Sequence, residues 1–126
     1  MEDADIKPEE GSSRLLAALP YLLGWLIGLI IFLVARDRYA KFHALQAVLF
    51  GLCLSLALGI AVIIGFFIYI PIFLVTLGTS NCIVMPLFIL FVLSMIAINL
   101  YLAYLAYSGR AFMIPFIGRI ALDHVS

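Results

Sequence analysis

The chain alternates between short polar stretches and long runs that carry no charge. Residues 15–35 have no charged side chain, and residues 42–109 contain no Asp, Glu, Lys or Arg. Each run reaches or exceeds the roughly 20 residues that a helix needs to cross the hydrocarbon core of a bilayer. The pattern therefore predicts an all-α, multi-pass membrane protein.

We expect three transmembrane helices in this chain. The first covers Leu15–Ala35, the second runs from about Phe42 to Ile70, and the third runs from about Ile83 to Tyr107. Pro71 is expected to kink or end the second helix, because proline cannot donate the helical backbone hydrogen bond. Two arrangements stay open for residues 66–85. We favour one bent second span over an extra, re-entrant element.

Polar segments flank the predicted membrane domain, residues 15–110. Residues 1–14 hold five acids and two bases, and we expect a disordered acidic tail. Residues 111–126 mix apolar and charged side chains and are expected to lie at the membrane interface. With three spans, the basic hinge at residues 36–46 shares a side with this C-terminal tail. The positive-inside rule then predicts a cytoplasmic C-terminus and an N-terminus outside.

Composition supports the membrane class and removes several functions. The chain is 67% apolar and 11% charged, against roughly 45–50% and about 25% in soluble domains. A net charge of zero leaves no bulk basic surface for nucleic acid. Cys53 and Cys82 match no metal-binding spacing, and His43 and His124 are the only histidines. We expect no metal, no cofactor, no catalytic residue and no enzymatic activity, because the spans lack a nucleophile with a base.

Small residues recur at helical spacing in the first two predicted spans. Gly24 and Gly28 form a G-x-x-x-G pair, which lets a neighbouring backbone approach closely. One face of the second span carries a stripe with a four-residue repeat: His43, Ala47, Gly51, Ser55 and Gly59. We interpret this stripe as a packing groove. His43 is either a proton-sensitive or partner-binding group at its mouth or, as we favour, an interfacial side chain that bonds a headgroup or the backbone.

Asn99 is the other polar candidate inside a span. It lies about 12 Å from the end of the third span by helical rise. An unpaired amide at that depth is costly. We therefore expect a hydrogen bond from Asn99 to the stripe, near Gly51 to Ser55.

Four segments of the sequence resemble a known family. They are Leu19-Pro-Tyr-Leu-Leu-Gly-Trp25, Arg38-Tyr-Ala-Lys-Phe-His-Ala-Leu-Gln-Ala47, and Ala106-Tyr-Ser-Gly-Arg110 followed by Ile114-Pro-Phe-Ile-Gly118. They resemble small prokaryotic membrane proteins of unknown function related to the twenty-kilodalton Tic component of the protein-import translocon in the chloroplast inner envelope. The resemblance implies a non-enzymatic, multi-pass protein of a prokaryotic cell membrane that serves a larger assembly.

Three functions stay open at this point. The leading one is an accessory or structural subunit of a membrane protein complex, with a link to protein translocation. The alternatives are a small homo-oligomeric channel or carrier and an anchor for an enzyme cofactor. The expected partners are the lipid bilayer and other membrane subunits or copies of this chain. The candidate contact residues are Arg38, Lys41, Phe42, His43, Gln46, Gly51, Ser55, Asn99, Gly109 and Arg110.

Overall fold

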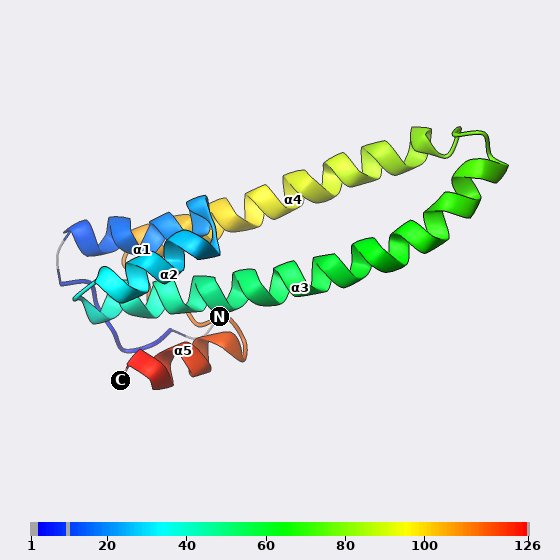
Figure 1. Cartoon of the computed structure of the whole chain (residues 1–126). Helices are drawn as coiled ribbons and strands as arrows, with labels where there is room; N and C mark the ends of the chain where they lie inside the picture. Colours follow the sequence, from blue (N-terminus) through cyan, green and yellow to red (C-terminus); the bar gives the residue numbers. More distant parts are fainter. Residues whose placement is uncertain (1–2, 10, 126) are drawn as a thin grey trace. The chain divides into compact units, whose positions relative to one another are not determined.

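The computed structural model describes residues 3–9 and 11–125, which form five α-helices (Figure 1). The helices are α1 (Gly11–Leu23), α2 (Trp25–Val34), α3 (Arg38–Val75), α4 (Asn81–Tyr107) and α5 (Ile117–Val125). The predicted all-α class is therefore confirmed for the described residues. Glu2 and Glu10 of the predicted acidic tail lie outside them.

The chain divides into two compact units. The terminal unit comprises residues 1–53 and 99–126, and the hairpin unit comprises residues 54–98. The terminal unit holds α1, α2, α5 and the polar ends of α3 and α4. All seven Lys and Arg residues belong to it, because residues 42–109 carry no charge.

The predicted first span, Leu15–Ala35, is not one continuous helix. The chain breaks at Gly24, whose φ of 103° and ψ of 171° is a conformation that residues with a Cβ rarely adopt. Helices α1 and α2 pack against each other, and Figure 1 shows α2 returning alongside α1. Of the described helices, α3 and α4 are long and apolar enough to cross a membrane. The predicted count of three spans is therefore not confirmed.

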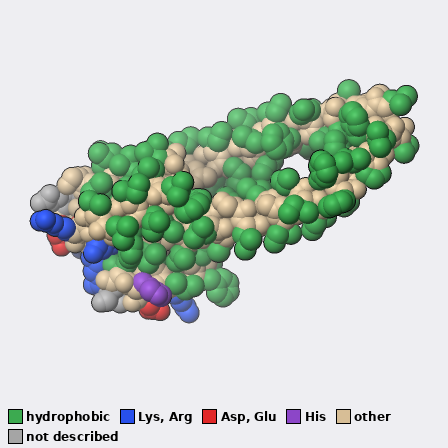
Figure 2. Space-filling model, viewed as in Figure 1, with side chains coloured by type: hydrophobic (Ala, Val, Ile, Leu, Met, Phe, Trp, Pro, Cys, Tyr) green, Lys and Arg blue, Asp and Glu red, His purple; other side chains and the backbone are tan. Residues whose placement is uncertain are grey.

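The two long helices expose their apolar surface. None of the residues 54–98 is buried, and Figure 2 shows apolar side chains distributed along the visible face of α3 and α4. A soluble protein would bury such helices in its core, since a contiguous apolar surface of this extent is unfavourable in water. This is the surface of a membrane protein.

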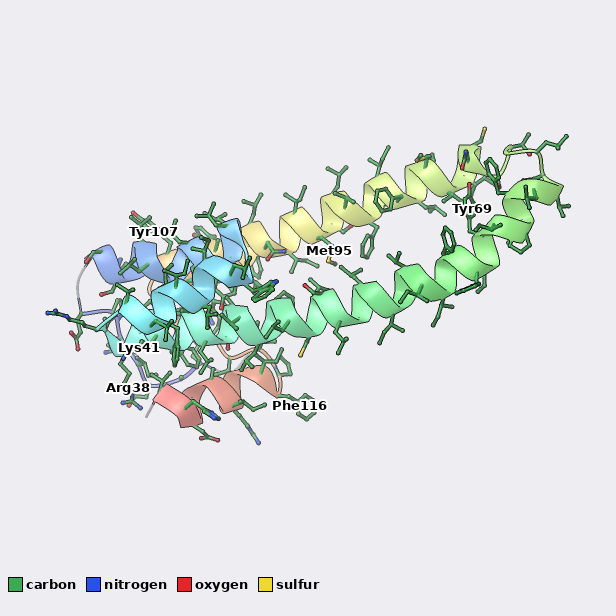
Figure 3. The ribbon with its side chains drawn as sticks, in the orientation of Figure 1. Arg38, Lys41, Tyr69, Met95, Tyr107 and Phe116 are labelled. Atoms are coloured by element: carbon green, nitrogen blue, oxygen red, sulfur yellow. The ribbon has the colours of Figure 1, made fainter. Side chains whose placement is uncertain are left out.

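Helix α3 continues through Pro71 and ends at Val75. Figure 1 shows its axis curving toward that end, as the predicted bend requires. The turn that follows begins with a hydrogen bond from the Gly78 N–H to the Phe73 carbonyl oxygen, 3.0 Å. Residues 66–85 therefore form the end of α3, a turn and the start of α4, with no extra re-entrant element. Figure 3 shows Tyr69 near this turn, where its hydroxyl donates a hydrogen bond to the Asn81 amide oxygen.

In the terminal unit, the segment before α1 packs against the segment after α4. The Ala4 N–H donates to the Ala111 carbonyl oxygen at 2.6 Å, and Arg110 forms an ion pair with Asp3 at 3.0 Å. Ile6 is buried in the same apolar core. The predicted orientation put Asp3 and Arg110 on opposite faces of the membrane. A direct ion pair between them does not fit that separation.

Candidate functional site

Three buried polar side chains line one face of α3. Tyr39, His43 and Gln46 are spaced i, i+4 and i+7, so the helix places them one above the other on the same face. All three have no exposed surface. Burying polar groups is costly unless each finds a hydrogen-bond partner, so these three side chains require partners within the chain.

Their partners are backbone atoms at the end of α4 and just beyond it. The Tyr39 hydroxyl donates to the Ala106 carbonyl oxygen at 2.5 Å. The His43 Nε2 atom lies 3.0 Å from the Arg110 carbonyl oxygen. Gln46 Nε2 donates to the Phe112 carbonyl oxygen at 3.2 Å, and its Oε1 accepts from the Ile114 N–H at 3.1 Å. The α3 face thus holds residues 110–114, which we call the C-terminal segment, through hydrogen bonds to the peptide groups of that segment.

Tyr21 of α1 completes this arrangement. Gln46 Nε2 donates to the Tyr21 hydroxyl oxygen at 3.0 Å, and that hydroxyl lies 3.3 Å from His43 Nδ1. A carbonyl oxygen can only accept, so His43 carries its proton on Nε2, and Nδ1 accepts the hydroxyl hydrogen of Tyr21. We call Tyr21, Tyr39, His43 and Gln46 the polar cluster.

Aromatic rings enclose His43. Its ring centroid lies 4.6 Å from that of Tyr39, 4.9 Å from Phe112, 5.2 Å from Phe42 and 6.1 Å from Tyr21. Phe42 and Phe112 have no exposed surface, so this shell keeps water away from the ring. Both ring nitrogens of His43 and both N–H groups of Gln46 are already bonded inside the chain. The polar cluster therefore holds the C-terminal segment in place. We call the cluster and this segment together the clamp.

Several predicted site residues meet at this clamp. Phe42, His43 and Gln46 come from α3, while Gly109 and Arg110 follow α4. Gly109 ends α4 in a left-handed conformation with φ 91°. The Arg110 N–H bonds the Leu105 carbonyl oxygen and the Gly109 N–H bonds that of Ala106, both at 3.3 Å. This helix-ending pattern favours glycine, and it directs the chain into the C-terminal segment.

The other predicted residues lie outside the clamp. Arg38 is exposed and Lys41 is partly exposed on the first turns of α3 (Figure 3). Ser55 is exposed in the hairpin unit. Asn99 is partly buried in α4, and its hydrogen bond to the stripe stays a prediction.

The small-residue stripe is partly filled within the chain itself. Gly51 faces Trp25 of α2 so closely that a Cβ at Gly51 would lie 2.6 Å from the Trp25 Cβ. Gly28 of α2 packs in the same way, since its Cβ would lie 3.0 Å from Val48 Cγ2. In contrast, a Cβ at Gly59 would meet nothing within 4 Å. Helix α2 thus packs into the predicted groove at Gly51, whereas the surface of α3 at Gly59 is open.

Sequence reasoning did not select Tyr21 or Tyr39 as site residues. The i, i+4, i+7 spacing of Tyr39, His43 and Gln46 was a usable signal, because it places three polar side chains on one face of an apolar helix. Tyr21 comes from another helix, and no helical spacing in the sequence links it to these three residues.

The arrangement offers little for metal or covalent chemistry. Within residues 3–9 and 11–125, no group of three or more His, Cys, Asp and Glu could hold a metal ion. Cys53 and Cys82 are free and exposed. His124 lies on α5, where its Nδ1 is 2.8 Å from the Ile120 carbonyl oxygen.

No curated protein and no solved structure matches the chain significantly. A family model does match, over residues 12–121, and it describes proteins of magnetosome magnetite crystal formation. The resemblance to proteins related to the twenty-kilodalton Tic component was therefore wrong, and the link to protein translocation that rested on it falls with it. Because the match covers most of its length, the chain belongs to the magnetosome magnetite crystal formation protein family, MamF/MmsF.

Proposed function

We propose that this protein takes part in magnetite crystal formation as a non-enzymatic component of the magnetosome membrane. The family description names that process, and the two long, exposed apolar helices support residence in a membrane. The observation that carries the non-enzymatic part is the polar cluster. Its donors and acceptors are bonded to the chain's own backbone or to one another, so the most elaborate polar site in the described residues serves the fold.

The protein acts on crystals indirectly, through other components of the membrane. No Asp or Glu occurs between Asp37 and Asp123. The turn between α3 and α4 therefore offers hydroxyl and amide groups but neither the carboxylate nor the imidazole side chains that hold non-haem iron in proteins. This supports a role in organising the bilayer and its proteins, with other membrane subunits or further copies of this chain as partners.

The charges support one orientation for the C-terminal part of the chain. All seven Lys and Arg residues lie in residues 7–41 and 110–119. The positive-inside rule assigns such a concentration of basic side chains to the cytoplasmic side. The uncharged turn at residues 76–80 then faces the compartment in which the crystal grows.

The channel alternative has no comparable support. It required His43 to face water, whereas His43 has no exposed surface and is surrounded by aromatic rings. We therefore retain the structural component as the single proposal.

Deleting the gene that encodes this protein, in the cell that makes it, tests the proposal. Electron microscopy should show magnetite crystals of altered size, number or shape, and the wild-type chain should restore them. The Gln46→Leu variant, in which the clamp is broken, should restore them poorly. Crystals unchanged by the deletion would count against a role in their formation.

Purification in a gentle detergent separates the structural role from its alternatives. Mass spectrometry should identify other magnetosome membrane proteins or further copies of the chain in the purified complex. A lone monomer, or turnover of a substrate by the purified chain, would contradict the proposal.

A further inference from the structure

We infer that α1 and α2 form a re-entrant hairpin, which enters the bilayer and returns to the side that it left. The segment before α1 then lies on the same side of the membrane as the segment after α4. This inference concerns how the chain meets lipid, and it stands apart from the proposed role in crystal formation.

Neither helix is long enough to cross a bilayer. Helix α1 has 13 residues and α2 has 10, which correspond to lengths of about 20 Å and 15 Å. The hydrocarbon core is about 30 Å thick. Because the chain reverses at Gly24, the two lengths do not add up to one span.

The tip of the hairpin is apolar and exposed. Leu22, Leu23 and Leu26 surround Gly24 and have 52%, 62% and 60% of their surface exposed. The outer face of α2 continues this surface with Leu33 and Val34, which are more than 70% exposed. A turn between helices in water normally carries polar residues. A tip of leucines indicates that lipid surrounds it.

The peptide groups of Gly24 itself are paired within the chain. Irregular backbone is tolerated inside a membrane only where its polar groups find partners within the protein. The Gly24 N–H donates to the Pro20 carbonyl oxygen at 3.0 Å, and the Gly24 carbonyl oxygen accepts from the Gly28 N–H at 3.2 Å. The break at Gly24 therefore leaves its own peptide groups paired.

The hairpin is also anchored on α3. The packing of Trp25 against Gly51 and of Gly28 against Val48 joins the hairpin to the start of the long helix. A second apolar core is formed where α1, α2 and α3 meet, with Ile31, Ala40 and Ala44 among its buried members. The tip thus lies beside a helix that itself enters the bilayer.

Three contacts place the beginning of this region beside the end of α4. A Cβ at Gly109 would lie 3.6 Å from the Arg14 guanidinium, so the first turn of α1 adjoins the end of α4. Further out, Asp3 pairs with Arg110 at 3.0 Å, and Ala4 bonds Ala111. Segments on opposite sides of a bilayer could not make these contacts.

Labelling of single cysteines with a membrane-impermeant maleimide tests the inference. The background is the full chain with Cys53→Ser and Cys82→Ser, reconstituted in sealed vesicles and sorted by orientation. Each test position is exposed, so its substitution leaves the core intact. The four test variants are Asp5→Cys, Asp123→Cys, Thr79→Cys and Leu23→Cys.

We expect the cysteines at Asp5 and Asp123 to react from the same side. The cysteine at Thr79 should react only from the other side, and the one at Leu23 only after detergent opens the bilayer. Reaction of the Asp5 and Asp123 positions from opposite sides would show that α1 and α2 cross the membrane. Reaction of the Leu23 position in intact vesicles, from either side, would show that the tip does not lie in the hydrocarbon. Either result overturns the re-entrant hairpin.

Discussion

Replacing Gln46 by leucine should loosen the C-terminal segment while leaving the helices in place. Leucine has nearly the size of glutamine but neither donates nor accepts hydrogen bonds. The substitution strips the Phe112 carbonyl oxygen and the Ile114 N–H of their side-chain partner. Each unpaired buried group costs about 1–3 kcal/mol. With two such groups, we expect Gln46→Leu to lower the free energy of unfolding by about 2–6 kcal/mol.

The single tryptophan provides the assay for this variant. Trp25 packs on Gly51 inside the terminal unit, so its fluorescence reports the unfolding of that unit during an SDS titration in mixed micelles. Trypsin supplies a local measurement, because it cleaves after Arg110 and Arg119. We expect the midpoint of the titration to fall and cleavage at these two arginines to become faster.

Ser55→Leu is the matched control. It makes the same polar-to-leucine change on the same helix, but Ser55 is exposed. We expect its unfolding free energy to change by less than about 0.5 kcal/mol. If Gln46→Leu and Ser55→Leu have the same midpoint and the same rate of cleavage, the view of Gln46 as the holder of the C-terminal segment is refuted.

Three further predictions concern the glycines and the surface ion pair. Gly51→Val should separate α2 from α3 and shift the Trp25 emission maximum, whereas Gly59→Val, where a Cβ meets nothing within 4 Å, should leave the spectrum unchanged. Gly109→Ala forces a Cβ into a left-handed conformation, φ 91°, and should lower the unfolding free energy by about 1–2 kcal/mol in the same titration. Asp3→Asn removes an ion pair whose side chains are about half exposed, so it should cost less than about 1 kcal/mol, and an equally large effect at high salt would contradict this.

The long helices could be predicted because their signals are local. Uncharged runs predicted spans at about residues 42–70 and 83–107, and the structure has Arg38–Val75 and Asn81–Tyr107. Length and hydropathy alone determine such segments. The helix ends were predicted less accurately. Helix α3 begins directly after its cap, Asp37, which accepts a hydrogen bond from the Ala40 N–H at 3.2 Å.

The break at Gly24 was not predictable from the apolar pattern. Glycine is common inside membrane helices, and Gly24 and Gly28 look equivalent in sequence. In the structure they have different roles, because Gly28 packs against α3 while Gly24 reverses the chain. Only the tertiary contacts of the hairpin decide which glycine leaves the helix.

The side chains of the clamp could be predicted in part, but their backbone partners could not. His43 and Gln46 could be identified because they are polar residues near the start of a long apolar helix. Apart from the Tyr21 hydroxyl, their partners are backbone groups that lie 66 to 68 residues away, and every residue possesses such groups. The sequence therefore does not indicate which peptide group a side chain will bond.

Recognition of peptide groups has a consequence for how the C-terminal segment tolerates change. The face of α3 contacts carbonyl oxygens and an N–H, so it is insensitive to the side chain carried at a partly exposed position such as Ile114. Deleting one residue between Gly109 and Ile114 is different, because it shifts every later peptide group out of register with His43 and Gln46. The segment is therefore constrained in its number of residues more than in their identity.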